Sequence, residues 1–322
     1  MEELGNYLKN NDEEWQQTKE KAYQYNGWFT PEFIDTACDK IVSGFLNKDL
    51  LTSWVNHYHL DDNIEPKNVG IVMAGNIPLV GFHDFLAVFI SGHRQTIKLS
   101  SKDNVLLKQL VKVMTGIDSQ VKEMVVFAEI LKGCDAYIAT GSNNSSRYFE
   151  QYFAKYPHII RKNRTSVAIV SGNETPTDLD LLGDDVNLYF GLGCRNVSKL
   201  YVPRDYDFVP LLRSFDKYIY FADHHKYKNN YDYQLSIALL NNIFYMTNGS
   251  TLLTENTALF SPISHLYYEQ YEDREQLTSR LEQSDDLQCI IGEGSVTFGA
   301  AQKPGLFSYA DGMDTMQFLL SL

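Results

Sequence analysis

Apolar and polar residues alternate along the chain in blocks whose spacing predicts helices and strands. The first 63 residues have helical spacing, with Trp15 and Ala22 on one apolar face and Trp54 on a later one. After that segment, short apolar runs alternate with amphipathic stretches. The runs predict strands at 69–73, 95–99, 136–139 and 166–170, and the stretches predict helices at 82–89, 106–114 and 142–152. A strand, a helix and a strand in succession form a βαβ unit, so we predict an α/β protein with a parallel sheet.

Elsewhere the patterns are weaker. They predict helices at 124–131, 179–189 and 272–282, and strands near 200–202 and at 251–253, 257–260 and 287–291. Residues 231–250 are rich in aromatic side chains and fit either one helix or a helix followed by a strand. The tail, 301–322, is predicted to be a strand segment whose exposed edge pairs with another subunit, which would make the protein a homo-oligomer.

Composition and charge mainly exclude classes of function. The chain has 322 residues and a net charge of −13, which argues against general binding to nucleic acids or to anionic membranes. Its four cysteines lie far apart with no Cys-x-x-Cys pair, so neither a zinc site nor a disulfide framework is expected. The N-terminus lacks the features of a signal peptide, and no apolar run approaches the roughly 18 residues that span a bilayer. We therefore expect a cytoplasmic protein that is not integral to a membrane and binds no metal.

One cysteine stands in a setting that suits a nucleophile. Cys194 lies in Gly-Leu-Gly-Cys-Arg-Asn, between closely spaced glycines and a predicted strand. Glycine lets a backbone or a substrate approach closely, and a thiol at such a turn would have backbone N–H groups nearby to stabilise an oxyanion. The alternative is an inert cysteine that is buried ahead of a core strand.

A second group of candidate residues follows the predicted strands. Ligands of parallel sheets bind beyond the carboxyl ends of the strands, which is where Asn76 and the run Lys98–Leu99–Ser100–Ser101–Lys102 fall. Thr140–Gly141–Ser142 opens a helix whose N–H groups suit a phosphate, although Ser142 equally suits an ordinary helix N-cap. The basic cluster at 161–164 fits either a surface run or a phosphate contact. The chain has no Gly-x-Gly-x-x-Gly fingerprint.

With these motifs in order, the chain resembles an acyl-CoA reductase of the bioluminescence (LuxC) type, within the aldehyde dehydrogenase superfamily. The similarity runs from residue 69 to about 202, and the final third of the chain matches more loosely. Val-Gly-Ile-Val…Gly-Asn-x-Pro…Ser-Gly-His…Ile-Lys-Leu-Ser-Ser resembles the superfamily's strand–turn–helix–strand segment. Ala-Thr-Gly-Ser resembles its Thr-Gly-Ser turn, and Gly-Leu-Gly-Cys-Arg-Asn resembles its nucleophile loop.

The resemblance implies an aldehyde-dehydrogenase-like fold, shortened relative to the superfamily, with a parallel-sheet cofactor domain and an α/β catalytic domain. The expected parts are an N-terminal helical segment of the cofactor domain (1–65), a nucleotide-binding domain (66–172), a catalytic domain (173–300) and a C-terminal strand segment (301–322).

The resemblance also implies roles for single residues. Cys194 would take the acyl group as a thioester, and Asn76 would stabilise the oxyanion together with the backbone N–H of Cys194. Lys98 would bind the adenosine ribose of the cofactor. Thr140, Gly141 and Ser142 would lie near its pyrophosphate or nicotinamide.

Two departures from the superfamily pattern carry information. Many aldehyde dehydrogenases have an acid shortly after the lysine, which bonds the ribose hydroxyls of NAD. Here Ser100, Ser101 and Lys102 occupy that stretch, which favours the 2′-phosphate of NADPH, with NADH as the alternative. Hydrolytic members carry a glutamate before the nucleophile that activates water, whereas residues 161–172 contain none. An acyl-enzyme would then persist until coenzyme A or a reductant takes up the acyl group.

We therefore expect NADPH-dependent reduction of a fatty acyl-CoA to the aldehyde through a thioester on Cys194. One alternative is an aldehyde dehydrogenase that makes a free acid, with Glu174 or a distal carboxylate as the base. The other is a catalytically inactive scaffold that binds the cofactor.

Overall fold

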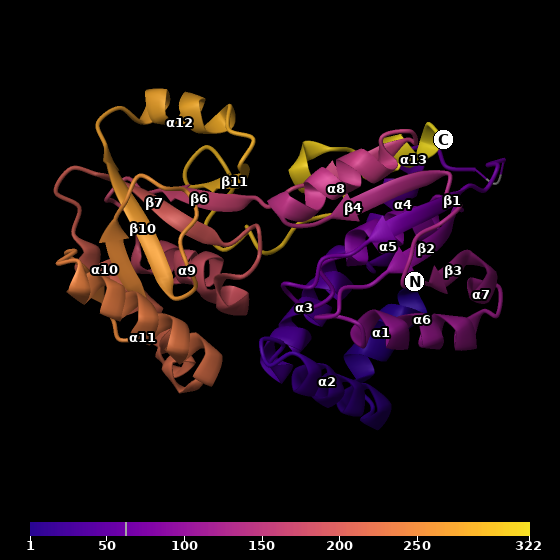
Figure 1. Ribbon diagram of the computed structural model, residues 1–322, viewed down its shortest axis with the longest axis horizontal. Coiled ribbons are helices and arrows are strands. Elements are labelled where there is room, and N and C mark those ends of the chain that lie inside the picture. Colours follow the sequence, from indigo (N-terminus) through magenta and orange to yellow (C-terminus); the bar gives the residue numbers. More distant parts are fainter. Residues whose placement is uncertain (62) are drawn as a thin grey trace. The chain divides into compact units, whose positions relative to one another are not determined.

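Two β-sheets organise the chain, and each belongs to a compact unit of its own (Figure 1). The computed structural model describes residues 1–61 and 63–322. The first unit comprises residues 1–163 and 304–322, and the second comprises residues 164–303. Helices and mostly parallel strands alternate in both units, so the predicted α/β class is confirmed.

The sheet of the first unit has five strands, all parallel, in the order β3-β2-β1-β4-β5. Residues 69–71 of β1 and 136–139 of β4 are all buried, as expected of central strands that are covered on both faces. The elements before the second unit are α1 (Glu2–Asn10), α2 (Glu13–Tyr25), α3 (Pro31–Gly44), α4 (Lys48–His57), β1 (Asn68–Val72), α5 (Phe82–Ile90), β2 (Arg94–Lys98), α6 (Leu106–Ile117), α7 (Val121–Met124), β3 (Val125–Phe127), β4 (Ala136–Thr140), α8 (Asn143–Phe153) and β5 (His158–Arg161).

The C-terminal tail returns to this unit as a helix, so the predicted terminal strand is wrong. The short 3₁₀ turn η3 (Ala310–Gly312) leads to α13 (Thr315–Leu320), which begins where the Asp314 carboxylate accepts the N–H of Gln317. Met316 and Leu319 of α13 are buried in the core of the first unit, and that burial favours a helix here. The tail therefore offers no strand edge for pairing with another subunit.

The sheet of the second unit has the order β11-β6-β7-β10-β9-β8, and only β8 is antiparallel to its neighbour. Alternate residues of β6 face opposite sides. Ala168 packs with α9 and α10, whereas Val167 and Ile169 pack with α12. The elements are β6 (Thr165–Ile169), α9 (Pro176–Asn187), η1 (Leu188–Gly191), β7 (Val197–Pro203), α10 (Phe208–Ser214), η2 (Phe215–Asp223), α11 (His225–Leu240), β8 (Met246–Thr247), β9 (Leu252–Glu255), β10 (His265–Tyr271), α12 (Arg274–Glu282) and β11 (Leu287–Ile291).

The structure overturns two local predictions and decides between the alternatives left open in a third segment. The helix expected at 124–131 is wrong: α7 ends at Met124, and the β-branched residues that follow form β3 against β2. The strand expected at 257–260 is also wrong, since these residues lie in a loop whose carbonyls accept side-chain hydrogen bonds from β7. Residues 231–250 prove to be a helix followed by a strand, α11 and β8.

The second unit begins at residue 164, earlier than the boundary that was expected after residue 172. Strand β6 pairs with β7 and β11 and so belongs to the second sheet. The basic cluster that precedes it is dispersed: Arg161 is buried against Asp84, Lys162 pairs with Glu150 on the surface, and Arg164 donates to the Leu287 carbonyl. These contacts favour a structural role for the cluster.

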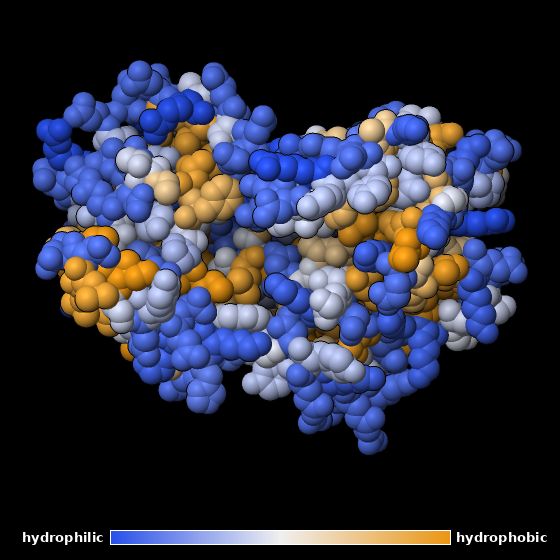
Figure 2. Space-filling model, in the orientation of Figure 1, coloured by the Kyte–Doolittle hydropathy of each residue, from blue (hydrophilic) through white to orange (hydrophobic). Residues whose placement is uncertain are grey.

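Surface hydropathy is uneven. Apolar side chains are visible over the α10 region of the second unit (Figure 2). The exposed apolar residues of this unit include Val209, Ile219, Leu240 and Phe244. Within the described residues, no helix is long and apolar enough to cross a membrane.

Candidate active site

The predicted cofactor-binding residues lie at the carboxyl edge of the sheet of the first unit. Val72 at the end of β1 is in register with Lys98 at the end of β2 and with Ala139 near the end of β4. The chain runs from β1 outward to β2 and β3 on one side, and to β4 and β5 on the other. The strand order therefore reverses between β1 and β4, which is where open parallel sheets bind ligands. The structure brings the predicted cofactor segments, 98–102 and 140–142, to this one edge.

The loop after β2 is closely packed against the loop after β1. The Met73 N–H donates to the Lys98 carbonyl at 3.0 Å, and the Lys102 N–H donates to Ser100 Oγ at 3.2 Å. A Cβ on Gly75 would lie 2.7 Å from Ser100, so only glycine permits this approach. Lys98, Ser101 and Lys102 are exposed, which leaves two ammonium groups and a hydroxyl facing solvent at the edge.

The turn after β4 opens helix α8. Ser142 caps this helix by accepting the Ser145 N–H at 3.3 Å, so the interpretation of Ser142 as a helix N-cap is confirmed. Gly141 is again sterically required, because a Cβ there would lie 2.9 Å from Ser145 and Phe149 side-chain atoms. Thr140 ends β4 and is half-buried. Capping does not exclude anion binding, since an N-terminus presents several N–H groups.

Asn76 is half-buried in the loop after β1, and this loop is held in place by a hydrogen bond from Leu79. Leu79 has a left-handed backbone with φ of 55°, unusual for an apolar residue, and its N–H donates to Asp103 Oδ2 at 2.8 Å. Asp103 is buried, and this burial raises its pKa to about 6. Asp103 is thus a support of the Asn76 loop that sequence reasoning missed; its only sequence signal is its place just after Lys102.

The candidate nucleophile lies in the second unit, in the turn that carries Cys194. The Asn196 N–H donates to the Gly193 carbonyl at 3.0 Å, which closes a β-turn with Cys194 and Arg195 at its centre. Cys194 is half-buried, and none of the four cysteines forms a disulfide. The thiol therefore sits at the tip of a defined turn just before β7.

Backbone strain precedes this turn. Tyr189 and Phe190 are both left-handed, with φ of 56° and 57°, and Gly191 follows with φ of 72°. Left-handed backbone costs about 1–2 kcal/mol for each residue with a Cβ. The two rings are buried, and Phe190 packs against Phe221 with ring centroids 4.5 Å apart. Burial of these aromatic rings offsets the strain and holds the chain on its path to Cys194.

Two polar side chains hold the Cys194 turn from within the unit. The Asn196 side chain accepts the Gly193 N–H at 2.8 Å and donates to two carbonyls in the last turn of α9 and to that of Leu188, just after the helix. Ser166 Oγ donates to the Cys194 carbonyl at 3.0 Å and lies 3.0 Å from Cys289 Sγ. Burial raises the pKa of the Cys289 thiol. Sequence reasoning assigned no role to these three residues, although Asn196 stands in the motif itself.

Glu174 lies at the other end of the second sheet. Its carboxylate accepts the N–H and hydroxyl of Ser171 and the N–H of Gly172, beyond the carboxyl end of β6. Cys194 lies at the amino end, beside Ser166, and roughly 16 Å of extended chain separates Ser166 from Ser171. Glu174 is therefore unsuited to act as a base for a thioester on Cys194.

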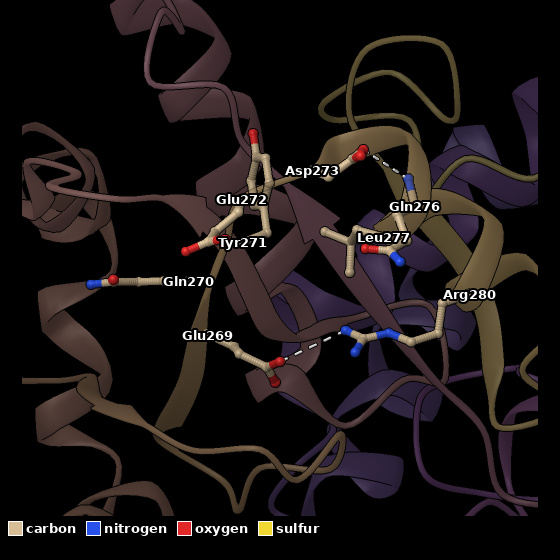
Figure 3. Close-up of a pocket in the computed structure, with 8 residues that line it drawn as sticks. All are labelled: Glu269, Gln270, Tyr271, Glu272, Asp273, Gln276, Leu277 and Arg280. Carbon is tan, nitrogen blue, oxygen red and sulfur yellow. Dashed lines mark hydrogen bonds and ion pairs between the residues drawn. The ribbon is translucent and has the colours of Figure 1, made fainter.

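The same end of the sheet carries a hollow of about 500 Å³ between the end of β10 and α12 (Figure 3). Glu269 points into it and lies 3.7 Å from Arg280, while Asp273 caps α12 through the Gln276 N–H. Since this hollow lies beyond the carboxyl end of β10, it is not part of the Cys194 turn. No group of three or more His, Cys, Asp or Glu side chains in the described part of the chain is arranged to hold a metal ion.

Solved structures identify the fold. An aldehyde dehydrogenase from Bacillus cereus, in its NAD⁺ complex, has a TM-score of 0.65 and 13% identity, covering 90% of this chain and 70% of that one. Indole-3-acetaldehyde dehydrogenase from P. syringae, in complex with NAD⁺, has a TM-score of 0.63 and 11% identity, covering 89% and 69%. The chain has the aldehyde dehydrogenase fold.

Betaine aldehyde dehydrogenase from Staphylococcus aureus, in complex with NAD⁺, is similar to the same extent, with a TM-score of 0.63, 11% identity and coverage of 90% and 68%. The chain thus spans about two thirds of the length of these proteins, in line with the expected shortening. No protein-family model and no curated protein sequence matches the chain. At this identity the likeness establishes the fold and leaves the chemistry to the residues.

Proposed function

We propose that the protein reduces a fatty acyl-CoA to the aldehyde with NADPH, through a thioester on Cys194. The observation that carries this proposal is the Cys194 turn, in which the half-buried thiol lies between two peptide groups that are fixed by hydrogen bonds from Asn196 and Ser166. A nucleophile in acyl transfer needs such fixed N–H groups beside it, because charge develops on the substrate oxygen in the transition state.

In the first half-reaction the Cys194 thiolate attacks the thioester carbonyl of acyl-CoA. The carbonyl oxygen becomes an oxyanion, for which we propose the backbone N–H of Cys194 as a donor; the side-chain amide of Asn76 is the second donor that the family resemblance implies. The oxyanion collapses, the bond to the coenzyme A sulfur breaks, and coenzyme A leaves as its thiol after taking up a proton. Cys194 is left acylated.

Residues at the edge of the first sheet fit a phosphate-bearing nicotinamide cofactor. Lys98 and Lys102 are exposed cations there, and the N-terminus of α8 lies at the same edge. Ser100 and Ser101 occupy the stretch in which many aldehyde dehydrogenases have an acid, whose charge would repel a 2′-phosphate. We propose that Thr140, Gly141 and Ser142 bind the pyrophosphate or the nicotinamide half. When bound, NADPH supplies the reducing equivalent that converts the acyl group to the aldehyde. The Cys194 sulfur then leaves as a thiolate.

The position of Glu174 supports reduction over hydrolysis. With its carboxylate bound at the far end of β6, it cannot activate a water at Cys194. The aldehyde dehydrogenase that makes a free acid remains the second candidate, favoured by the activities named for the solved structures of the same fold.

Intact mass spectrometry tests the proposal. The protein is incubated with acetyl-, octanoyl- and palmitoyl-CoA without cofactor, beside Cys194→Ala. We expect an acyl adduct only with Cys194 present, which disappears as aldehyde forms on addition of NADPH. Turnover of an aldehyde to free acid without coenzyme A would favour the second candidate. An absence of both reactions would favour the inactive scaffold.

A further inference from the structure

We propose that Asn196 is a positioning residue, which fixes the peptide planes on either side of Cys194 for acyl transfer. The inference rests on the proposed function of Cys194 and adds a residue for which the family resemblance implies no role. Asn196 is buried, and every polar atom of its side chain is engaged within its own unit.

Its side-chain amide closes the segment between α9 and the turn. Nδ2 donates to the carbonyls of Leu188 at 2.9 Å, Asp185 at 3.1 Å and Val186 at 3.3 Å. Asp185 and Val186 are in the last turn of α9, where carbonyls lack partners inside the helix, and Leu188 is the residue that follows the helix. Asn196 therefore caps the carboxyl end of α9 and ties it to the turn that the strained residues 189–191 lead into.

The same side chain sets the direction of the chain at Cys194. Oδ1 accepts the Gly193 N–H at 2.8 Å, and the Asn196 N–H holds the Gly193 carbonyl. A trans peptide directs its N–H opposite to its carbonyl, so the Cys194 N–H points out of the turn. Ser166 holds the next plane through the Cys194 carbonyl, at 3.0 Å, and its own N–H donates to the Asn196 carbonyl.

This geometry separates two reactions of the same thiol. Acylation forms an oxyanion and depends on the direction of the N–H donors, whereas alkylation by iodoacetamide displaces iodide without forming an oxyanion. A displacement of about 1 Å in catalytic geometry can cost roughly 10²-fold in rate. Loss of the Asn196 side chain should therefore slow acylation far more than alkylation.

The experiment compares Asn196→Ala with wild type and with Asn187→Ala. Asn187 is a matched control: it is also buried at the end of α9, but its side chain bonds Gly183 and Thr251 and not the turn. Rates of Cys194 acylation by octanoyl-CoA and of alkylation by iodoacetamide are followed by mass spectrometry across pH 6–9. We expect Asn196→Ala to lose about 10²-fold in acylation and less than 3-fold in alkylation, and Asn187→Ala to change neither.

Equal losses in both rates, or no loss of acylation, would overturn the role of Asn196. A wild type that is alkylated but never acylated would instead contradict the proposed function, so the two failures are distinguishable. If Asn196→Ala does not fold, hydrogen exchange of the wild type decides: the Gly193 N–H should be strongly protected, and rapid exchange would contradict its bond to Asn196.

Discussion

At the residue scale, the second unit shows which part of a candidate nucleophile site can be predicted from a sequence. Cys194 was predicted because glycines beside a thiol indicate a tight turn. Asn196 was not, because nothing in one sequence says that a carboxamide two residues later bonds back to the end of the preceding helix. The bonds of Asn196 depend on the path through Tyr189 and Phe190, whose left-handed backbone no propensity predicts.

Asp103 in the first unit gives a prediction about pH. Burial raises its pKa to about 6, against about 3.9 in an unfolded chain. The folded state therefore holds the proton more tightly, and its stability falls as the pH rises from 4 to 6. In Asp103→Asn the amide oxygen still accepts the hydrogen bond of the Leu79 N–H, and the side chain at position 103 no longer titrates.

We expect the free energy of unfolding of wild type to fall relative to that of Asp103→Asn by about 2 kcal/mol in total between pH 4 and 6, most steeply near pH 5. Urea unfolding at several pH values measures this difference. A difference that stays constant across the range would show that Asp103 does not titrate there.

At the scale of elements, the parallel strands were predicted well and the edges were not. Strands β1, β4 and β6 are buried on both faces, so their continuous apolar runs are visible in the sequence. Strand β3 is an edge strand of three residues, too short to show a period, and was predicted as helix. The tail is helical because Met316 and Leu319 find a place in the first core, which depends on contacts distant in sequence.

The contact that secures this tail gives the next prediction. Arg161 of β5 pairs with Asp84 of α5 and donates to Thr315 of α13 at 2.8 Å, all buried. Arg161→Ala leaves the Asp84 carboxylate buried without its cation, which should cost about 3–5 kcal/mol. The neighbouring pair, Lys162 with Glu150, is exposed on the surface, so Lys162→Ala should cost less than about 1 kcal/mol.

Denaturant unfolding of the two variants measures both values. The double variant Arg161→Met with Asp84→Asn should recover part of the loss, because it removes the unpaired charge along with the cation. If Arg161→Ala loses as little unfolding free energy as Lys162→Ala, the Arg161 pair does not anchor the tail.

For the whole molecule, the candidate chemistry is divided between two units. The residues proposed to bind NADPH lie in the first, which spans 1–163 and 304–322, and the thiol lies in the second, 164–303. The acyl-transfer half-reaction needs no cofactor, and cofactor binding needs no thiol. Variants that remove one function should therefore spare the other.

Lys102→Ala removes an exposed cation proposed to bind the 2′-phosphate, and a charge-assisted hydrogen bond contributes about 1.5–3 kcal/mol. We expect NADPH to bind about 10–100-fold more weakly, from the same energy, with NADH affinity and cofactor-free acylation of Cys194 unchanged. Cys194→Ala should abolish acylation and leave the Kd for NADPH within about twofold, since the thiol adds no bond to the phosphates. Fluorescence titration of the reduced cofactors and mass spectrometry of the acyl-enzyme give both readouts. Equal weakening of NADPH and NADH by Lys102→Ala would contradict a 2′-phosphate contact, because the two cofactors differ only in that group.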